Sequence, residues 1–404
     1  MNTPNSLIDY DQVSSHVENL PWCALVANGG RVGSDFFQSL LDGHPEIFVF
    51  NGQVYFHEWW AASPVTQFDG SLNADDIIYD FIGAHLNKLR SQYDYFERKG
   101  YLGETEDQSV SVDLDEFRRH MRGLCSNRPI TSKFFLTSVY VAYALCVGQD
   151  VMIKRVFFHH VHHIRKLDNY LGDFPDSKVI CMIRDPRTVY VSGVEHWRKH
   201  SSKADNPSFP LYVFWRITEE ARPLLRYDSG RVRALRLEDL GNRDVLDSVC
   251  KWLGISYEEC LQNSTWAGLR WWGDQLSPRR ASQEEKGFSK AVVRNNWESK
   301  LRPLDVYVID YLISDRLAWF GYPSGYRYGT LAKFIVPLLI LFPTTFERRY
   351  LGLSYLIGKL KSKNFKDILR SFYHPARRIK FYFTLYIRQF MKAESWLQPF
   401  GPHN

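Results

Sequence analysis

The chain has 404 residues, enough for one large domain and an extension, and 45% of them are hydrophobic. It carries 51 Lys and Arg against 45 Asp and Glu, a net charge of +6. The six cysteines show no close pairing pattern, which argues against a disulfide-rich secreted fold and favours reduced thiols. The first 20 residues lack the apolar run of a signal peptide, so we expect a cytoplasmic protein.

The first predicted strand covers 22–27 and leads into a glycine-rich turn. Its residues are apolar or small, as in a buried parallel strand. The three glycines within 29–33 allow positive φ angles and close approach of the backbone. A helix should begin near Ser34, because apolar residues then recur at helical spacing at Phe36, Phe37, Leu40 and Leu41.

The start of that helix is a candidate anion site, because its first N–H groups point into the loop. Arg31 adds a guanidinium that can donate two hydrogen bonds to one oxyanion. An ordinary strand–turn–helix, in which Ser34 only caps the helix, would explain the same pattern. The loop lacks the Gly-Lys-Ser/Thr ending of a Walker A motif, and with it the hydroxyl that usually binds Mg²⁺.

A second strand, turn and helix lie further along the chain. The apolar strand 178–183 is followed by Asp185-Pro186, which places Pro at the first position of a helix. Arg184 lies at the carboxyl edge of the strand, where open α/β sheets bind ligands, and Ser192 follows two turns on. Arg184 and Ser192 could hold one phosphate from two sides. Alternatively, Arg184 forms a structural salt bridge with Asp185 or another neighbour.

Together the two segments resemble the phosphate-binding motifs of sulfotransferases that use 3′-phosphoadenosine-5′-phosphosulfate (PAPS). In that family an Arg/Lys-x-Gly-Ser/Thr loop holds the 5′-phosphosulfate, and an Arg-Asp-Pro-Arg segment with a later Ser holds the 3′-phosphate. The resemblance covers about 22–322, including 235–255 and 296–322, and 40–46 is similar to the Golgi-type and bacterial carbohydrate sulfotransferases. It implies that the cofactor is bound by Arg31, Val32, Gly33, Ser34, Asp35, Phe36, Arg184 and Ser192.

Two positions depart from the family pattern. Val32 stands where Ser is usual, and Asp35 stands where Ser or Thr is usual. A carboxylate in the first turn favours a helix start, but it would repel a phosphosulfate unless it points away or accepts a proton or hydrogen bond. Asp35 could instead contact the acceptor.

The resemblance implies an α/β fold like that of P-loop NTPases, with a mostly parallel sheet flanked by helices, within a sulfotransferase domain at 1–326. The residues agree, because strand patterns occur at 22–27, 47–50, 151–157, 178–183 and 232–237. The helical periodicity of 74–147 predicts a mainly helical insertion, which we expect to shape the acceptor cleft.

Sulfuryl transfer requires positive charge at the leaving phosphate and a base for the attacking hydroxyl. Lys154 lies in an apolar strand pattern, where the family often has a Lys, and could supply charge together with Arg31. Alternatively, Lys154 merely ends a strand and faces water.

Two regions could supply the base. One is Glu58 with His57, since some bacterial sulfotransferases are similar in having a catalytic Glu in this region. The other is the histidine cluster 159–163, in particular His159 and His160. The cytosolic sulfotransferases have their catalytic His at the position of Val156, so that role does not carry over directly. A metal site at His159 and His163 has no further ligand pattern to support it, so we expect none.

Lys290 and Arg294 precede Trp297 and align loosely with a late basic loop of the family that contacts the 3′-phosphate. They are further candidate cofactor ligands.

The region 327–404 differs in character from the rest. It carries 14 Lys and Arg against 3 Asp and Glu, a net charge of +11, whereas the preceding residues carry −5. The apolar run 331–342 is too short to cross a bilayer, and basic and aromatic residues alternate in 377–383. This composition favours a helical extension on an anionic membrane surface, and the alternative is a helical cap packed on the catalytic domain. Nucleic-acid binding is not expected, because no matching motif appears.

The sequence therefore predicts a bacterial, PAPS-dependent sulfotransferase without a metal requirement, located in the cytoplasm at the inner face of the membrane. The expected acceptor is a hydroxyl of a glycan or lipid-linked glycan. The alternatives are a P-loop-like kinase and a nucleotide-binding scaffold without catalysis.

Overall fold

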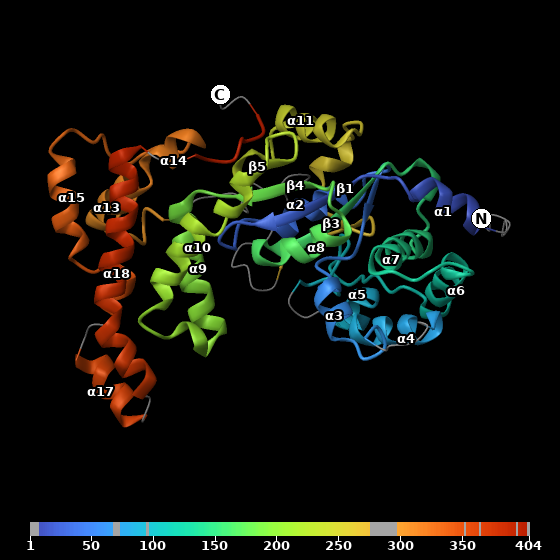
Figure 1. Ribbon diagram of the computed structural model, residues 1–404, viewed down its shortest axis with the longest axis horizontal. Coiled ribbons are helices and arrows are strands. Elements are labelled where there is room, and N and C mark those ends of the chain that lie inside the picture. Colours follow the sequence, from blue (N-terminus) through green and yellow to red (C-terminus); the bar gives the residue numbers. More distant parts are fainter. Residues whose placement is uncertain are drawn as a thin grey trace. The chain divides into compact units, whose positions relative to one another are not determined.

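The computed structural model describes residues 8–67, 73–93, 97–274, 297–350, 353–362, 365–392 and 395–401 (Figure 1). Its centre is a mostly parallel five-stranded sheet in the order β2-β3-β1-β4-β5. The strands are β1 (Trp22–Ala27), β2 (Ile47–Val49), β3 (Val156–His163), β4 (Lys178–Ile183) and β5 (Val232–Arg236). The expectation of an α/β fold with a mostly parallel sheet flanked by helices is confirmed.

The sequence located four of the five strands well. β1 and β4 have the predicted bounds, and every residue of β1 is buried, as the apolar pattern requires. The prediction of a strand at 151–157 was wrong in position, because β3 begins only at Val156. Residues 151–153 form a 3-10 turn that begins after Asp150, whose side chain accepts a hydrogen bond from the Met152 N–H. β3 instead runs through the histidine cluster, because these side chains find partners within the fold.

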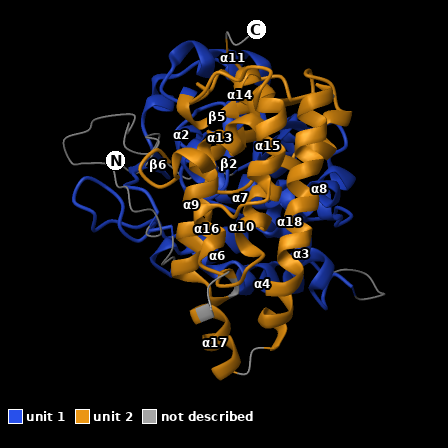
Figure 2. Cartoon of the chain, turned by 90° about the vertical axis from the view of Figure 1, so that its left-hand side faces the viewer, with its two compact units in different colours: residues 1–26, 33–180, 239–293 blue, residues 27–32, 181–238, 294–404 orange. Residues whose placement is uncertain are grey.

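The chain divides into two compact units, which Figure 2 distinguishes by colour. Unit 1 comprises 1–26, 33–180 and 239–293. The stretch 74–147, predicted as a helical insertion, lies within it and contains α4, α5, α6 and α7. The helices of unit 1 are α1 (Tyr10–Val17), α2 (Ser34–Leu41), α3 (Phe56–Ala62), α4 (Ala74–Ala84), α5 (Leu86–Leu89), α6 (Leu114–Cys125), α7 (Ser132–Cys146), α8 (Leu167–Asp173) and α11 (Arg243–Leu253).

Stacked aromatic rings hold the strands of unit 1 together. The ring of Phe157 on β3 stacks between those of Trp22 on β1 and Phe48 on β2, with centroid distances of 4.4 and 4.3 Å. β2 and β3 are parallel, with Ile47 opposite Val156. A short antiparallel pair, β6 (Thr265–Trp266) and β7 (Leu269–Arg270), belongs to the same unit, with Trp266 buried in β6 and Trp271 and Trp272 buried directly after β7.

Unit 2 comprises 27–32, 181–238 and 294–404, so the predicted boundary near residue 327 falls inside it. Its helices are α9 (Pro186–His200), α10 (Phe209–Glu219), α13 (Pro303–Leu312), α14 (Ser314–Trp319), α15 (Ala332–Ile340), α16 (Thr345–Arg348), α17 (Leu353–Lys361) and α18 (Phe365–Met391). The C-terminal extension is helical as predicted, and α18 packs against α13, α15 and α17.

The C-terminal segment returns to the edge of β5. The Ala234 N–H donates to the Gln398 carbonyl, and the Phe400 N–H donates to the Ala234 carbonyl, at 2.9 and 3.0 Å. Among the described helices, none combines the length and apolar content needed to cross a membrane.

Candidate functional site

The loop between β1 and α2 has an unusual backbone. Gly29, Gly30, Arg31 and Gly33 all have positive φ, at 86, 76, 56 and 77°. At Gly29 an added Cβ would lie 3.0 Å from a side-chain carbon of Ile217, so a side chain does not fit there. A non-glycine residue such as Arg31 adopts this conformation only at a cost of about 1–3 kcal/mol, and such strain concentrates at functional sites.

α2 begins at Ser34, as predicted. Its N-cap is Gly33 rather than Ser34, and the structure shows no side-chain cap at this helix start. The reading of Ser34 as a simple cap is therefore wrong. Because Gly33 has no side chain, the N-cap residue itself cannot accept hydrogen bonds from the first N–H groups of α2, and helix starts of this kind can bind anions.

A compact polar cluster surrounds the first turn of α2 within unit 1, and we call it the α2 cluster. It consists of Ser34, Asp35, Gln53, His160 and His162. His162 Nδ1 lies 2.9 Å from Gln53 Nε2, 3.2 Å from His160 Nε2 and 3.4 Å from Ser34 Oγ. Gln53 Nε2 also donates to Asp35 Oδ1 at 3.4 Å, and that oxygen lies 3.6 Å from His160 Nδ1.

The protonation of His160 follows from its neighbour Gln38. The Gln38 amide nitrogen donates to the Phe50 carbonyl at 2.8 Å, so its oxygen must accept a hydrogen bond from His160 Nδ1, also at 2.8 Å. Burial lowers the pKa of His160 to about 3, which keeps the ring neutral. Its Nε2 is therefore unprotonated where it faces His162 Nδ1.

Both protonation states of His162 Nδ1 consequently have a partner. Without a proton, this nitrogen accepts a hydrogen bond from the Gln53 amide, and with a proton it donates to His160 Nε2. A group that takes up and releases a proton requires such an environment. The sequence analysis did not single out His162. The sequence signal that could have indicated His162 is the alternation of side chains along a strand. It places His160 and His162 on one face of β3 and His159 on the other.

The other predicted catalytic residues lie elsewhere in unit 1. His159 is buried, lies 2.8 Å from the Tyr140 hydroxyl and stacks on Tyr170. Burial holds its pKa well below the usual range, which fits a neutral core residue. His57 Nε2 lies 3.1 Å from an Asp173 carboxylate oxygen, and Glu58 forms an ion pair with Lys166 at 2.8 Å.

Lys154 is not part of the α2 cluster. It precedes β3, at the opposite end of the strand from His162, and its amine donates to the carbonyls of Ile47 and His44 at 2.7 and 3.3 Å. It is buried rather than facing water, and burial lowers its pKa to about 8. Its contacts stabilise the turn before β2.

A buried Lys–Glu–Lys group, which the sequence did not indicate, lies beside the same loop as Gln53. Glu97 forms ion pairs with Lys88 at 2.9 Å and Lys99 at 2.6 Å, and the Lys99 amine lies 3.6 Å from the Trp266 ring centroid. Gly52 has a φ of 81°, which favours glycine, and a Cβ there would collide with the Lys99 amine unless the lysine side chain moved. The group carries a net charge of +1 and acts on the pKa of His160, whose main perturbation is burial.

The second predicted phosphate-binding segment lies in unit 2. Arg184 and Arg316 line a pocket together with Asn28 and apolar side chains. The Asn28 N–H donates to the Met182 carbonyl, so the pocket sits at the carboxyl ends of β1 and β4. Chain connections leave β1 and β4 towards opposite edges of the sheet, and such a switch point is where open α/β sheets bind ligands.

The Asp185 carboxylate pairs with Arg187 at 2.8 Å. It also caps α9 by accepting a hydrogen bond from the Arg187 N–H. Arg187 is fully buried and also pairs with Asp310 at 3.0 Å. Ser192 is half-buried on α9 and is not among the residues that line the pocket.

Glu238 fixes the turn that carries Arg184. Its two carboxylate oxygens accept hydrogen bonds from the Asp185 N–H and the Tyr322 hydroxyl, both at 3.0 Å. Burial raises the pKa of Glu238. Lys290 and Arg294 lie outside the described residues. Among the described residues, no group of three or more His, Cys, Asp or Glu side chains is arranged to hold a metal ion.

No protein-family model and no curated protein matches the sequence. The chain is similar to the solved sulfotransferase domain of an olefin synthase from Synechococcus PCC 7002, with 16% identity, a TM-score of 0.41, and 70% of this chain and 90% of that chain covered. It is also similar to a sulfotransferase domain from the curacin biosynthetic pathway, with 15% identity, a TM-score of 0.40 and coverages of 79% and 98%. A third similar structure is sulfotransferase STF9 from Mycobacterium avium, with 16% identity and a TM-score of 0.32. The match covers 62% of this chain and 69% of that chain.

Proposed function

We propose that the protein is a sulfotransferase that moves the sulfuryl group of PAPS to a hydroxyl of a glycan. The observation that carries the proposal is the start of α2, whose N-cap is Gly33 and whose preceding loop has positive φ at Gly29, Gly30 and Arg31. This backbone can surround an anion closely, and Arg31 adds a guanidinium. PAPS supplies a sulfuryl group whose bond to the 5′-phosphate breaks as the acceptor oxygen attacks in line.

The residues of the α2 cluster fit the remaining requirements of that reaction. We assign the uptake of the acceptor's proton to His162 at Nδ1, which lies 3.4 Å from Ser34 at the helix start. Asp35, which departs from the family pattern, accepts a hydrogen bond from Gln53 and lies near His160. A carboxylate held in this way can orient the acceptor hydroxyl instead of opposing the phosphosulfate.

Positive charge for the transferring group would come from Arg31, the amides of 33–36 and the Lys–Glu–Lys group. The Lys–Glu–Lys group would supply the positive charge that was expected from Lys154, because the Lys154 amine donates to backbone carbonyls instead. The Arg184 pocket would hold the 3′-phosphate, since two guanidinium groups line it.

Calorimetry with 3′-phosphoadenosine-5′-phosphate (PAP) tests the donor site. We expect the wild type to bind PAP much more tightly than ATP, because ATP lacks the 3′-phosphate. Arg31→Ala and Arg184→Ala should each weaken PAP binding about 10- to 100-fold, because each variant loses charged hydrogen bonds to a phosphate. Arg119→Ala, on the exposed face of α6, is the matched control and should bind PAP normally.

Adenosine 5′-phosphosulfate separates the two phosphate sites, because it lacks the 3′-phosphate. Arg184→Ala should bind it as the wild type does, whereas Arg31→Ala should bind it more weakly. Equal affinity of the wild type for PAP and ATP, together with turnover of ATP, would replace this proposal with the kinase alternative.

A further inference from the structure

The longest described helix of unit 2, α18, buries mainly polar side chains and exposes large apolar ones, the reverse of an ordinary surface helix. Its buried positions carry mainly polar or charged residues, namely Asp367, His374, Arg378, Tyr382 and Leu385. Its exposed positions carry large apolar ones, which are between 52% and 71% exposed: Phe365, Leu369, Phe372, Tyr373, Ile387, Phe390 and Met391. At about 100° per residue these exposed positions share a stripe about 100° wide, in two groups near the two ends of the helix, 365–373 and 387–391.

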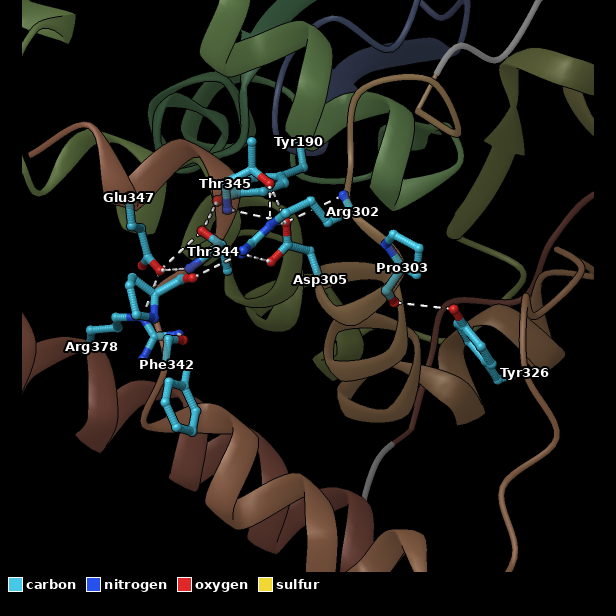
Figure 3. A network of polar contacts seen from close by, with 11 residues as sticks. Tyr190, Arg302, Pro303, Asp305, Tyr326, Phe342, Thr344, Thr345, Glu347 and Arg378 are labelled. Carbon is cyan, nitrogen blue, oxygen red and sulfur yellow. Dashed lines mark hydrogen bonds and ion pairs between the residues drawn. The ribbon is translucent and has the colours of Figure 1, made fainter.

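The polar face of α18 is fixed by a buried network, so the helix cannot simply rotate to hide its apolar face. Figure 3 shows Arg378 reaching Glu347, and the two side chains form an ion pair at 2.6 Å. Arg378 also donates to the Phe342 carbonyl at 2.6 Å, and Glu347 accepts a hydrogen bond from the Thr344 N–H at 2.9 Å. Breaking a buried ion pair costs several kcal/mol, which holds this face inward.

The neighbouring network in Figure 3 anchors α16 to α13 in the same way. Arg302 and Asp305 pair at 2.7 Å, and Arg302 donates to the Thr345 hydroxyl at 2.9 Å. The orientation of the extension within unit 2 is therefore set by polar contacts.

α15 packs beside α18 and shows a second exposed apolar face. Its buried side consists of Ala332, Val336 and Ile340. The exposed side chains on and around it are between 53% and 70% exposed and also share one stripe: Leu331, Phe334, Leu338, Leu341 and Phe342. The Lys333 amine lies 5.2 Å from the Phe390 ring centroid of α18, and the Tyr386 hydroxyl donates to the Lys333 carbonyl.

The exposed charges on these helices have one sign. The described residues after 326 include two acidic ones, Glu347 and Asp367, and both are buried and paired with basic side chains. The exposed charged side chains on the helices α15 to α18 are basic and include Lys333, Lys361, Lys366, Arg377 and Lys380. Large exposed apolar groups interspersed with basic ones match the interface of an anionic lipid bilayer.

We infer that the outer faces of α15 and α18 form a docking surface for an anionic lipid membrane. The apolar stripes would enter the boundary between headgroups and acyl chains, and the basic side chains would contact anionic headgroups. The charge pattern favours this occupant over a second copy of the chain, because two such surfaces repel each other. Docking of this kind does not depend on sulfuryl transfer, although a membrane location suits a lipid-linked acceptor.

Co-sedimentation of the full chain with vesicles tests the inference. The wild type should bind vesicles of phosphatidylcholine containing 30 mol% phosphatidylglycerol, a composition of about the charge on biological membranes. It should bind pure phosphatidylcholine far more weakly, and added salt should weaken binding to the anionic vesicles. Equal binding to both vesicle types, or none to either, would overturn the inference.

Two triple variants address the two components of the surface. Lys366→Gln/Arg377→Gln/Lys380→Gln should weaken partitioning into anionic vesicles on the order of 100-fold. Phe334→Ser/Phe372→Ser/Phe390→Ser should reduce binding at least as strongly, because three large apolar side chains leave the interface. Circular dichroism melts of both should match the wild type, since every changed side chain is exposed.

Two matched control variants change exposed side chains of unit 1 instead. Arg119→Gln/Arg155→Gln/Lys251→Gln removes the same charge there, and Tyr93→Ser/Tyr101→Ser removes exposed aromatic rings. Both should bind vesicles like the wild type. PAP affinity should be unchanged in every variant, so a failure of docking would not be confused with a failure of the donor site.

Sedimentation velocity distinguishes the competing occupant. If the wild type is a dimer, the phenylalanine variant is a monomer and vesicle binding is equal in both, the face is an interface between copies and the membrane inference fails.

Discussion

At the scale of single residues, neighbours in one histidine cluster have opposite roles. His159 stacks on Tyr170 inside the core, whereas His160 and His162 join the α2 cluster. The side chains of a strand alternate between faces, so membership in the site depends on the register of β3. The residue type and its position in the sequence do not distinguish them.

His162→Gln tests the proposed base. We expect kcat to fall by about 100-fold or more, with the KM for PAPS changed little, because the side chain acts on the acceptor hydroxyl. Steady-state kinetics of the variant and the wild type, with PAPS and acceptor each varied, provides the measurement.

His200→Gln, which changes an exposed histidine at the end of α9, is the control. If Glu58→Gln abolished turnover while His162→Gln retained it, the base would be Glu58, the other candidate that the sequence offers.

At the scale of elements, α2 and its preceding loop form because glycine permits the turn. Most residues of α2 are buried, and its first turn follows directly on the loop. The element was recognisable in the sequence because strand, glycines and helical periodicity are all local signals.

Gly33→Ala should remove about 1–2 kcal/mol of stability, the cost of a left-handed conformation for alanine, and should weaken PAP binding. Gly83→Ala lies in α4, where an added Cβ meets nothing within 4 Å, and should stabilise the protein by about 0.4–1 kcal/mol. Urea unfolding of both variants and calorimetry with PAP measure these effects. Equal stability of Gly33→Ala and the wild type would show that the loop does not need this backbone.

At the scale of the whole molecule, several titratable groups are buried in their neutral form. Burial lowers the pKa of His160 to about 3 and that of His85 to about 4, both below the value of about 6.5 in an unfolded chain. The folded state thus binds fewer protons than the unfolded state between pH 6.5 and pH 4. The contribution of these two histidines to the free energy of unfolding should be fully present above pH 6.5 and should fall as the pH decreases below it.

The free energy of unfolding in urea should fall by about 2 kcal/mol for each of these two histidines between pH 7.5 and pH 5. His160→Gln should show a correspondingly smaller loss. His200→Gln, exposed at the end of α9, should lose as much as the wild type. An identical loss in His160→Gln would contradict a neutral, buried His160.

The sequence alone determined the α/β class, the strand bounds of β1 and β4, the helix start at Ser34 and the basic helical extension. These features depend on local periodicity, glycine and proline positions and composition, which the residues carry themselves. Only the tertiary structure decided that β3 runs through the histidines, that Lys154 is bonded to backbone carbonyls, and that Lys88, Glu97 and Lys99 meet beside Gln53. It also decided which face of α18 is buried: Arg378 pairs with Glu347 on the inner side, which is not the face that the hydrophobic pattern would select. Such contacts join residues far apart in the chain, and no local pattern specifies them.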